Sequence, residues 1–376
     1  MQFAFTDEQE QFRAVVRRFV GDKSKTTEVR RLMATAEGFD PAVWRQLSDD
    51  LGLAGIHIPE AFGGSGFGAV ELGIAMEEMG RGLLCAPFLS SCVLAAGAIM
   101  EAASEDQKAL LLPPLASGQQ RAALAVTEAN GRWDADGVSV TATRADGGYV
   151  LQGRKRFVID GGTADRLVVV ARAPGTTGTA GISFFTLAAA ASGVTRTPLA
   201  TMDATRKQAD VRFDGARAEL LGEEGAGAMA LVRTLDGAAI ALANEMVGGA
   251  QALLDSAVAY ANMRVQFGRA IGSFQAIKHK CADMLLDLEL AKSAAYHAAQ
   301  AQAAGDAQWS GLASLAKAAA SDACMRTAAQ TIQIHGGIGF TWDNDTHLWF
   351  KRAKTSEVLL GDPNHHRELM LQRLEA

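Results

Sequence analysis

The sequence YANMRVQFGRAIGSFQ, residues 260–275, marks a turn between two long helical patterns in the C-terminal part of the chain. Before it, apolar residues recur at spacings of three and four, which is the period of a helix packed on one face. We predict that this helix ends near Phe267 and Gly268, because glycine readily adopts the positive φ of a helix C-cap. A second helix should begin near Ser273, a residue type favoured at the N-cap.

Hydrogen-bond donors flank this turn. Arg264 and Arg269 carry guanidinium groups, and Gln275 carries an amide close to the predicted helix start. Such donors can bind a diphosphate, because a helix N-terminus attracts anions and arginine forms strong charge-assisted hydrogen bonds. Taken alone, the turn fits equally well with arginines that simply face solvent.

A second stretch, TIQIHGGIGF at residues 331–340, interrupts another long alanine-rich helix with Gly336 and Gly337. The two motifs together, RxxFG followed by SFQA and then QxHGGxGFT, resemble those of the acyl-CoA dehydrogenase family of flavoproteins. The resemblance runs along essentially the whole chain. Two helix breaks in an alanine-rich bundle would explain the glycines, but not Arg264 and Gln275.

The resemblance implies a cofactor, FAD, and a role for each motif. In the family these residues hold the adenosine diphosphate part of an FAD that is shared across a subunit interface. The corresponding cofactor-binding residues here are Arg264, Phe267, Gln275, Gln333, Gly336 and Gly337.

Composition sets broad limits on the protein. The 376 residues predict two to three domains, and 48% hydrophobic with 21% charged residues is typical of a globular chain. A net charge of −6 gives no reason to expect nucleic acid or an anionic membrane as a partner. The four cysteines form no C-x-x-C motif, and the N-terminus does not resemble a signal peptide. We therefore expect a cytoplasmic protein without a membrane span.

The pattern along the chain changes twice. Residues 1–120 show helical periodicity with two capping boxes, Thr6 to Gln9 and Ser104 to Gln107, the second opening a helix expected to end at Pro113-Pro114. Residues 121–225 contain short alternating runs that predict an antiparallel β-barrel or sandwich, and residues 226–376 are helical again. This α+β order matches the family: a helical N-terminal domain, an antiparallel β-barrel middle domain and a C-terminal four-helix bundle.

The residue that performs the family's chemistry is missing. A glutamate removes a proton next to the thioester carbonyl, while the flavin accepts a hydride from the next carbon, giving a trans-2-enoyl-CoA. The glutamate usually lies in a late loop, and Leu360 holds that place here. Some relatives carry it on the helix before RxxFG, where this chain has Ala238. Glu245 and Glu357 are nearby fallback candidates, although each is expected to pair with a neighbouring arginine or lysine.

The flavin-ring side of the site also departs from the family pattern. Thr127 begins the segment that in the family lies along the ring and substrate, but Arg132 and Trp133 replace its Gly-Ser pair. Phe157 replaces the stacking tryptophan, and Ile159 lacks the hydroxyl that bonds near the reactive flavin nitrogen. His365-His366 could suggest a metal site, but no carboxylate or cysteine stands at ligand spacing, so solvent-facing or ion-paired histidines are expected.

These departures favour one interpretation over two others. The chain resembles a subunit of a two-chain bacterial acyl-CoA dehydrogenase of the steroid side-chain type, which donates its adenine half-site to a homologous partner. That partner would supply the glutamate, within a heterotetramer that acts on an acyl-CoA and passes electrons to an electron-transfer flavoprotein. The alternatives are a homomeric FAD enzyme that uses Glu245 or Glu357 as its base, and a non-catalytic structural or regulatory subunit.

Overall fold

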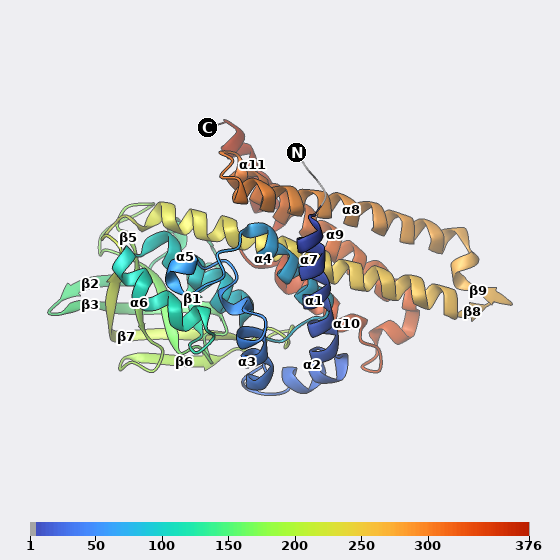
Figure 1. Cartoon of the computed structure of the whole chain (residues 1–376), viewed down its shortest axis with the longest axis horizontal. Helices are drawn as coiled ribbons and strands as arrows, with labels where there is room; N and C mark the ends of the chain where they lie inside the picture. Colours follow the sequence, from blue (N-terminus) through green and yellow to red (C-terminus); the bar gives the residue numbers. More distant parts are fainter. Residues whose placement is uncertain (1–4, 376) are drawn as a thin grey trace. The chain divides into compact units, whose positions relative to one another are not determined.

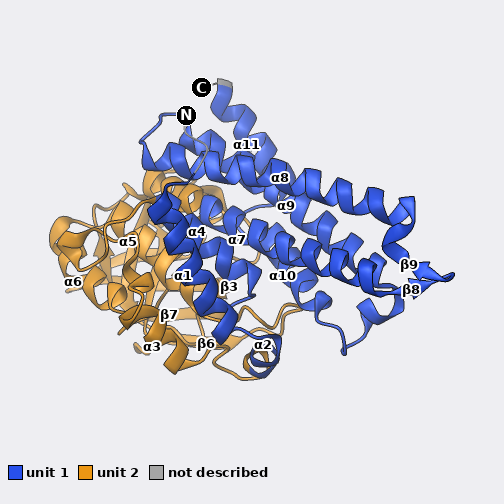
Figure 2. Cartoon of the chain, turned by 45° about the vertical axis from the view of Figure 1, so that its right-hand side comes forward, with its two compact units in different colours: residues 1–31, 69–84, 239–376 blue, residues 32–68, 85–238 orange. Residues whose placement is uncertain are grey.

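The computed structural model describes residues 5–375. The chain divides into two compact units, coloured separately in Figure 2. Unit 1 comprises residues 1–31, 69–84 and 239–376, and unit 2 comprises residues 32–68 and 85–238. Within residues 5–375, no helix is long and apolar enough to cross a membrane.

Unit 1 is helical, and its longest helices carry both sequence motifs at their ends (Figure 1). Helix α9 packs against α8, α10 and α11. The α-helices with residues in this unit are α1 (Asp7–Lys23), α2 (Thr26–Met33), α4 (Ala69–Arg81), α7 (Gly227–Met263), α8 (Gln275–Ala303), α9 (Trp309–His335), α10 (Thr346–Val358) and α11 (Pro363–Glu375). The predicted capping box opens α1: Thr6 and Gln9 each accept a hydrogen bond from the other's backbone N–H.

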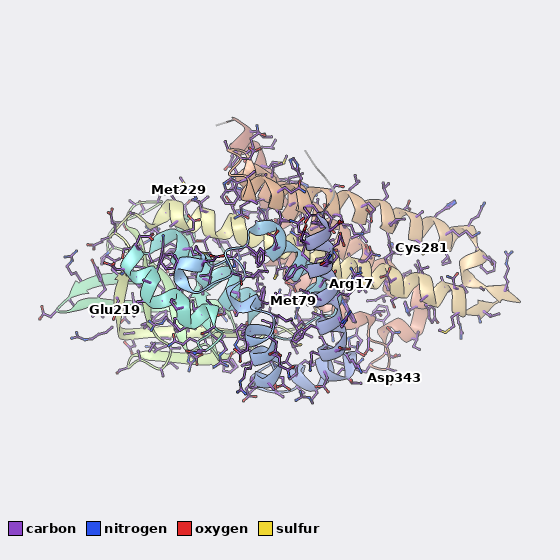
Figure 3. The ribbon with its side chains drawn as sticks, viewed as in Figure 1. Arg17, Met79, Glu219, Met229, Cys281 and Asp343 are labelled. Carbon is purple, nitrogen blue, oxygen red and sulfur yellow. The ribbon has the colours of Figure 1, made fainter. Side chains whose placement is uncertain are left out.

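Helices α1, α4 and α7 are held together by glycines and buried ion pairs. A Cβ atom on Gly80 of α4 would overlap the carbonyl oxygen of Glu245 on α7, so only glycine permits this approach. Arg13 of α1 bonds to Glu77 at 2.6 Å, and Arg17, labelled with Met79 in Figure 3, bonds to Glu78 at 2.8 Å. Close backbone approach therefore fixes α7, whose far end carries the RxxFG motif.

Unit 2 contains a closed β-structure. Strand pairing runs β1-β4-β2-β3-β7-β5, and a further pairing of β4 with β5 closes the ring, while β6 lies on β7. The strands are β1 (Ala122–Ala125), β2 (Thr141–Ala145), β3 (Gly148–Ile159), β4 (Arg166–Arg172), β5 (Ile182–Ala188), β6 (Val194–Pro198) and β7 (Gln208–Leu221). The β middle segment is confirmed, but β4 pairs in parallel with β1 and β2, so the barrel is not purely antiparallel.

The barrel core follows from the alternation along its strands. Inward-facing residues such as Leu151, Leu167, Val169, Phe185 and Phe213 are almost fully buried in one apolar cluster. Hydrophobic burial of this kind is the main driving force for folding of the segment.

Short helices complete unit 2. They are α3 (Pro41–Asp49), α5 (Ala96–Ala102), α6 (Glu105–Ala116) and a π-helix (Leu89–Ala95). The capping box at Ser104 is present, but the predicted end of α6 at Pro113-Pro114 is wrong, because the helix continues to Ala116. A proline lacks its own N–H, yet its carbonyl still accepts: the N–H of Ser117 donates to the carbonyl of Pro113 at 3.0 Å.

Candidate functional site

The RxxFG motif forms a β-hairpin rather than a helix end. Helix α7 stops at Met263, and strand β8 (Val265–Gln266) pairs with β9 (Arg269–Ala270). Phe267 and Gly268 form the two-residue turn with φ values of 53° and 77°, the positive signs that a type I′ hairpin requires. The predicted helix end near these residues is therefore wrong, although the positive φ of the glycine is present.

The start of the following helix also differs from the prediction. Ser273 lies in a 3₁₀ turn, and its hydroxyl donates to the carbonyl of Ala270 at 2.7 Å instead of capping a helix. Helix α8 begins at Gln275, with extended Phe274 at the N-cap. Gln275 thus stands in the first turn of α8, where backbone N–H groups have no partner within the helix.

The donors predicted to bind a diphosphate are free for a ligand. Arg264, Arg269 and Gln275 are all exposed. Across the described residues, the side chains of Arg264 and Gln275 have no hydrogen bond or ion pair, and Arg269 lies over the ring of Phe274 at 4.1 Å. The hairpin therefore presents cationic and amide donors beside a helix N-terminus, a combination suited to phosphate oxygens.

The second motif lies beside the first. The ring of Tyr260, one turn before Arg264, stacks on His335 with centroids 4.3 Å apart and planes 22° apart. Helix α9 ends at His335, and Gly336 adopts a φ of 65°, so the predicted helix break is present. Gln333 is therefore brought to the same end of unit 1 as Arg264.

The open surface at this end fits an adenosine diphosphate. A Cβ atom added to Gly336 or Gly337 would meet no atom within 4 Å, so space lies in front of both glycines. Phe267, at the tip of the hairpin, is 91% exposed and can pack on an adenine ring. We call this group of Arg264, Phe267, Gln275, Gln333, Gly336 and Gly337 the diphosphate clamp.

Leu360, which we expect at the position of the family's glutamate, lies in a tight turn between α10 and α11. Leu360 is 3% exposed and adopts a φ of 63°. Its carbonyl oxygen lies 3.0 Å from Nε2 of His366, which is buried. Burial and the nearby Lys317 lower the pKa of His366 to about 3, so this histidine is neutral. The expectation of a solvent-facing or ion-paired histidine is wrong for His366, because its ring packs beneath the turn.

Neither fallback carboxylate is free to act as a base. Glu245 is buried on α7 and pairs with Nη1 of Arg352 at 2.7 Å. Glu357 pairs with Lys354 on the last turn of α10. Each carboxylate is thus paired with a cation of its own unit, which favours its ionised form and makes it a weaker base.

The ring-side residues lie in unit 2. The hydroxyl of Thr127 donates to the carbonyl of Arg156 at 2.7 Å, and the N–H of Arg156 donates back to the carbonyl of Thr127 at 2.8 Å. Phe157 stands at a bulge of β3 with a φ of 57° and is 39% exposed, whereas Ile159 is buried. Arg132 pairs with Asp134 at the surface. An exposed aromatic ring remains here, but Ile159 offers no hydroxyl.

Sequence reasoning missed a buried ion pair behind this segment. Lys155 is fully buried and bonds to Glu128 at 2.8 Å and to the carbonyl of Val126 at 2.7 Å. Burial lowers the pKa of Lys155 to about 8, against the opposing effect of Glu128. Burial alone would raise the pKa of Glu128, but Lys155 and the hydrogen bonds from residues 139 and 140 lower it. In the sequence, the one feature that could have indicated this pair is a lysine at a strand position that faces inward.

Comparison with known proteins follows the same division of the chain. The acyl-CoA dehydrogenase N-terminal domain matches residues 6–119, the middle domain residues 123–216 and the C-terminal domain residues 225–375. The chain belongs to the acyl-CoA dehydrogenase family. This chain is therefore an oxidoreductase homologue, and the family's cofactor is FAD.

Three similar proteins match nearly the whole chain. Acyl-CoA dehydrogenase IpdE2 from Mycobacterium tuberculosis is 35% identical over 98% of this chain and 97% of its own length. The structure of a variant of the Tcur3481-Tcur3483 steroid ACAD has a TM-score of 0.88 at 29% identity, covering 98% of each chain. The ChsE4-ChsE5 complex from M. tuberculosis has a TM-score of 0.89 at 27% identity, covering 100% of this chain and 99% of that one.

For this acyl-CoA dehydrogenase homologue, the clamp residues fit the adenosine diphosphate of FAD on three grounds. They include exposed donors, they adjoin a helix N-terminus, and open space lies in front of the glycines. Position 360, where we expect the family's base, holds a leucine and no carboxylate. Among the residues that the structure describes, no cluster of histidine, cysteine and carboxylate side chains could hold a metal ion.

Proposed function

We propose that this chain is a subunit of a heteromeric, FAD-dependent acyl-CoA dehydrogenase. Its diphosphate clamp holds the adenosine diphosphate of an FAD whose isoalloxazine ring lies in a homologous partner chain. The partner supplies the glutamate that removes the proton. The observation that carries this proposal is the contrast between a clamp with unused donors and a base position occupied by Leu360.

The residues of this chain then bind and orient rather than transfer protons. Arg264 neutralises diphosphate charge, Gln275 and Gln333 donate amide hydrogen bonds, and Gly336-Gly337 let the backbone approach the cofactor closely. The bound FAD supplies the capacity to accept a hydride. The catalytic base belongs to the partner, because a leucine side chain cannot accept a proton.

The partner and substrate classes follow from the same interpretation. The name ChsE4-ChsE5 complex denotes two chains, and the Tcur3481-Tcur3483 protein is named a steroid ACAD. We therefore propose a heterotetramer that oxidises a bulky acyl-CoA, such as a steroid side-chain thioester, or otherwise a fatty acyl-CoA. An electron-transfer flavoprotein would be the acceptor.

The domain limits and the compartment are part of the proposal. We assign a helical domain to residues 1–120, a β-barrel domain to 121–225 and a helical bundle to 226–376. A cytoplasmic location agrees with free thiols at Cys85, Cys92, Cys281 and Cys324.

The rival homomer would need Glu245 or Glu357 as its base. Both carboxylates are paired with cations, Arg352 and Lys354, which makes each a weaker base. A purely structural subunit, the third possibility, would carry no FAD contact at all. The unused donors of the clamp argue against that role.

Purification of the lone chain and of the complex tests the proposal. The lone chain should be inactive with a panel of acyl-CoAs and a dye acceptor, since loss of a positioned base lowers rates roughly 10²–10⁴-fold. A two-plus-two complex with its partner should be active and hold two FAD rather than four, measured by flavin absorbance against protein concentration. Turnover by the lone chain, abolished by Glu245→Gln or Glu357→Gln, would establish the rival. An active complex with one FAD per chain would reject the half-site assignment.

A further inference from the structure

Helix α9 carries a buried lysine that the proposed function does not use. Lys317 lies in the first half of the helix and is 0% exposed. Burying an ammonium group is unfavourable unless its donors are bonded. A lysine in such a place therefore needs a structural reason.

The ammonium of Lys317 has an acceptor for each of its three N–H groups. It donates to Ser321 Oγ at 3.0 Å, to the carbonyl of Glu357 at 3.1 Å and to the carbonyl of Gly361 at 3.1 Å. The first acceptor lies one turn further along α9. The two carbonyls come from the end of α10 and the turn that follows it, on either side of Leu360.

This turn is conformationally unfavourable by itself. Leu360 and Gly361 adopt φ values of 63° and 105°, and a left-handed conformation is costly for leucine. A side chain at Gly361 would also overlap the ring of His365. The turn must therefore be held from outside, and its polar backbone atoms contact Lys317 from α9 and His366 from α11.

We propose that Lys317 is a positioning residue that holds position 360 in its left-handed conformation, whichever side chain stands there. This inference rests on the proposed function only in identifying position 360 as the place of the family's base. The clamp residue Gln333 lies 333 − 317 = 16 residues further along α9, roughly 24 Å at 1.5 Å per residue. Helix α9 thus carries both one residue of the clamp, Gln333, and the support of the turn.

The surroundings of Lys317 make the contact sensitive to pH. Burial lowers the pKa of Lys317 to about 7, against the opposing effects of Glu357, Asp362 and Cys324. His366 on α11 is a further titratable group that interacts with Lys317, and it is neutral. A neutral amine keeps two N–H donors, enough for the two carbonyls, and can accept from the Ser321 hydroxyl, so deprotonation preserves the contacts while removing the unfavourable burial of a charge.

Hydrogen exchange of the full chain tests the role of Lys317. Lys317→Met keeps the length of the side chain and removes the amine. Amide exchange of residues 358–362 should then rise about ten- to hundred-fold, because two backbone carbonyls lose a donor. Exchange near Gln333 should not change. Lys354→Met is the matched control, since Lys354 pairs with Glu357 only at the surface, and it should change exchange of the turn less than about two-fold.

The pH profile separates positioning from simple packing. In the wild type, protection of residues 358–362, corrected for intrinsic exchange, should rise as the pH increases through about 7, because opening the turn exposes the amine to water, where it binds a proton more readily. Lys317→Met should give a flat profile. If Lys317→Met fails to fold, Ser321→Ala removes one acceptor, further lowers the pKa of the amine and should shift the midpoint downward. Unchanged exchange in Lys317→Met, or a flat wild-type profile, would overturn the inference. Exchange requires no turnover, so an active lone chain would reject the proposed function and leave this result unaffected.

Discussion

The diphosphate clamp and the turn at Leu360 differ in how their polar groups are used, although both belong to unit 1. In the clamp, Arg264 and Gln275 are exposed and have no side-chain partner among the described residues. In the turn, the carbonyls of Glu357, Leu360 and Gly361 all contact buried side chains of the same chain. Donors without partners indicate a ligand from outside, whereas satisfied buried groups indicate a structural element.

The same contrast explains why the buried carboxylate of Glu245 is a structural group. Glu245 is buried, and burying a charge is tolerated only when a partner compensates it, as Arg352 does here. Such a pair holds α7 to α10 but leaves no free base. Unpaired donors at Arg264 and Gln275 beside paired interior carboxylates support our proposal of a subunit that binds cofactor for a partner.

The largest effect is expected from breaking the buried ion pair between Glu245 and Arg352. Glu245→Ala should lower the free energy of unfolding by about 3–5 kcal/mol, because it leaves the Arg352 guanidinium buried and unpaired. Urea unfolding followed by circular dichroism measures this. Glu357→Ala, which removes a more exposed pair, should cost less than about 1 kcal/mol. A loss below about 1 kcal/mol for Glu245→Ala would mean that the pair is not needed to hold the two helices.

The second-largest effect is expected on lowering the pH, which should reduce the contribution of His366 to the stability of the folded protein. The pKa of His366 is lowered to about 3, so the folded protein keeps this histidine neutral while the unfolded chain binds a proton below about pH 6.5. The contribution of this group to stability therefore falls as the pH drops from about 6.5 towards 3, by a few kcal/mol in total. His57 is half-buried, desolvation lowers its pKa to about 4, and it acts in the same direction.

The variant His366→Gln separates the two histidines. It should reduce the dependence of the unfolding free energy on pH between about 6.5 and 3. The part of this dependence that comes from His57 should remain. Unfolding curves at several pH values, for wild type and variant, measure the difference. An identical pH dependence in both proteins would show that the pKa of His366 is the same in the folded and unfolded states, which contradicts its burial as a neutral group.

A smaller effect is expected at the clamp. Arg264→Ala should weaken FAD binding to the complex by about 1.5–3 kcal/mol, which is roughly 10- to 150-fold, because a charge-assisted contact is lost. The flavin content after gel filtration measures this. Arg326→Ala is the matched control: Arg326 is also exposed, on α9, but pairs with Asp287 at 2.7 Å, and its loss should leave flavin content unchanged. Equal flavin retention in both variants would remove Arg264 from the clamp.

The smallest effect is predicted for the turn itself. Leu360→Glu supplies a carboxylate, yet the lone chain should remain without substantial acyl-CoA dehydrogenase activity. The reason is that Arg132, Trp133, Phe157 and Ile159 also depart from the family pattern on the ring side. Dye-linked assays with a panel of acyl-CoAs check this. Clear dehydrogenation by the single variant would show that the ring-side residues are adequate and that only the base is missing.

Local signals in the sequence were sufficient for the order of the elements. Helix, then β-structure, then helix follows from hydrophobic period, and both capping boxes depend on residues only three positions apart. The absence of a carboxylate at position 360 and the donors at Arg264 and Gln275 are also properties of the sequence alone. These features need no knowledge of distant contacts.

Tertiary structure decided what depends on residues far apart in the chain. The hairpin at Phe267-Gly268 replaced a predicted helix end, and β4 pairs in parallel with strands that alternation cannot order. Lys317 and the turn that it supports are 40 or more residues apart, as the hydrogen bonds to Glu357 and Gly361 record. Whether a polar side chain is a free donor or a buried support depends on which distant groups fold against it, and that information is absent from local spacing.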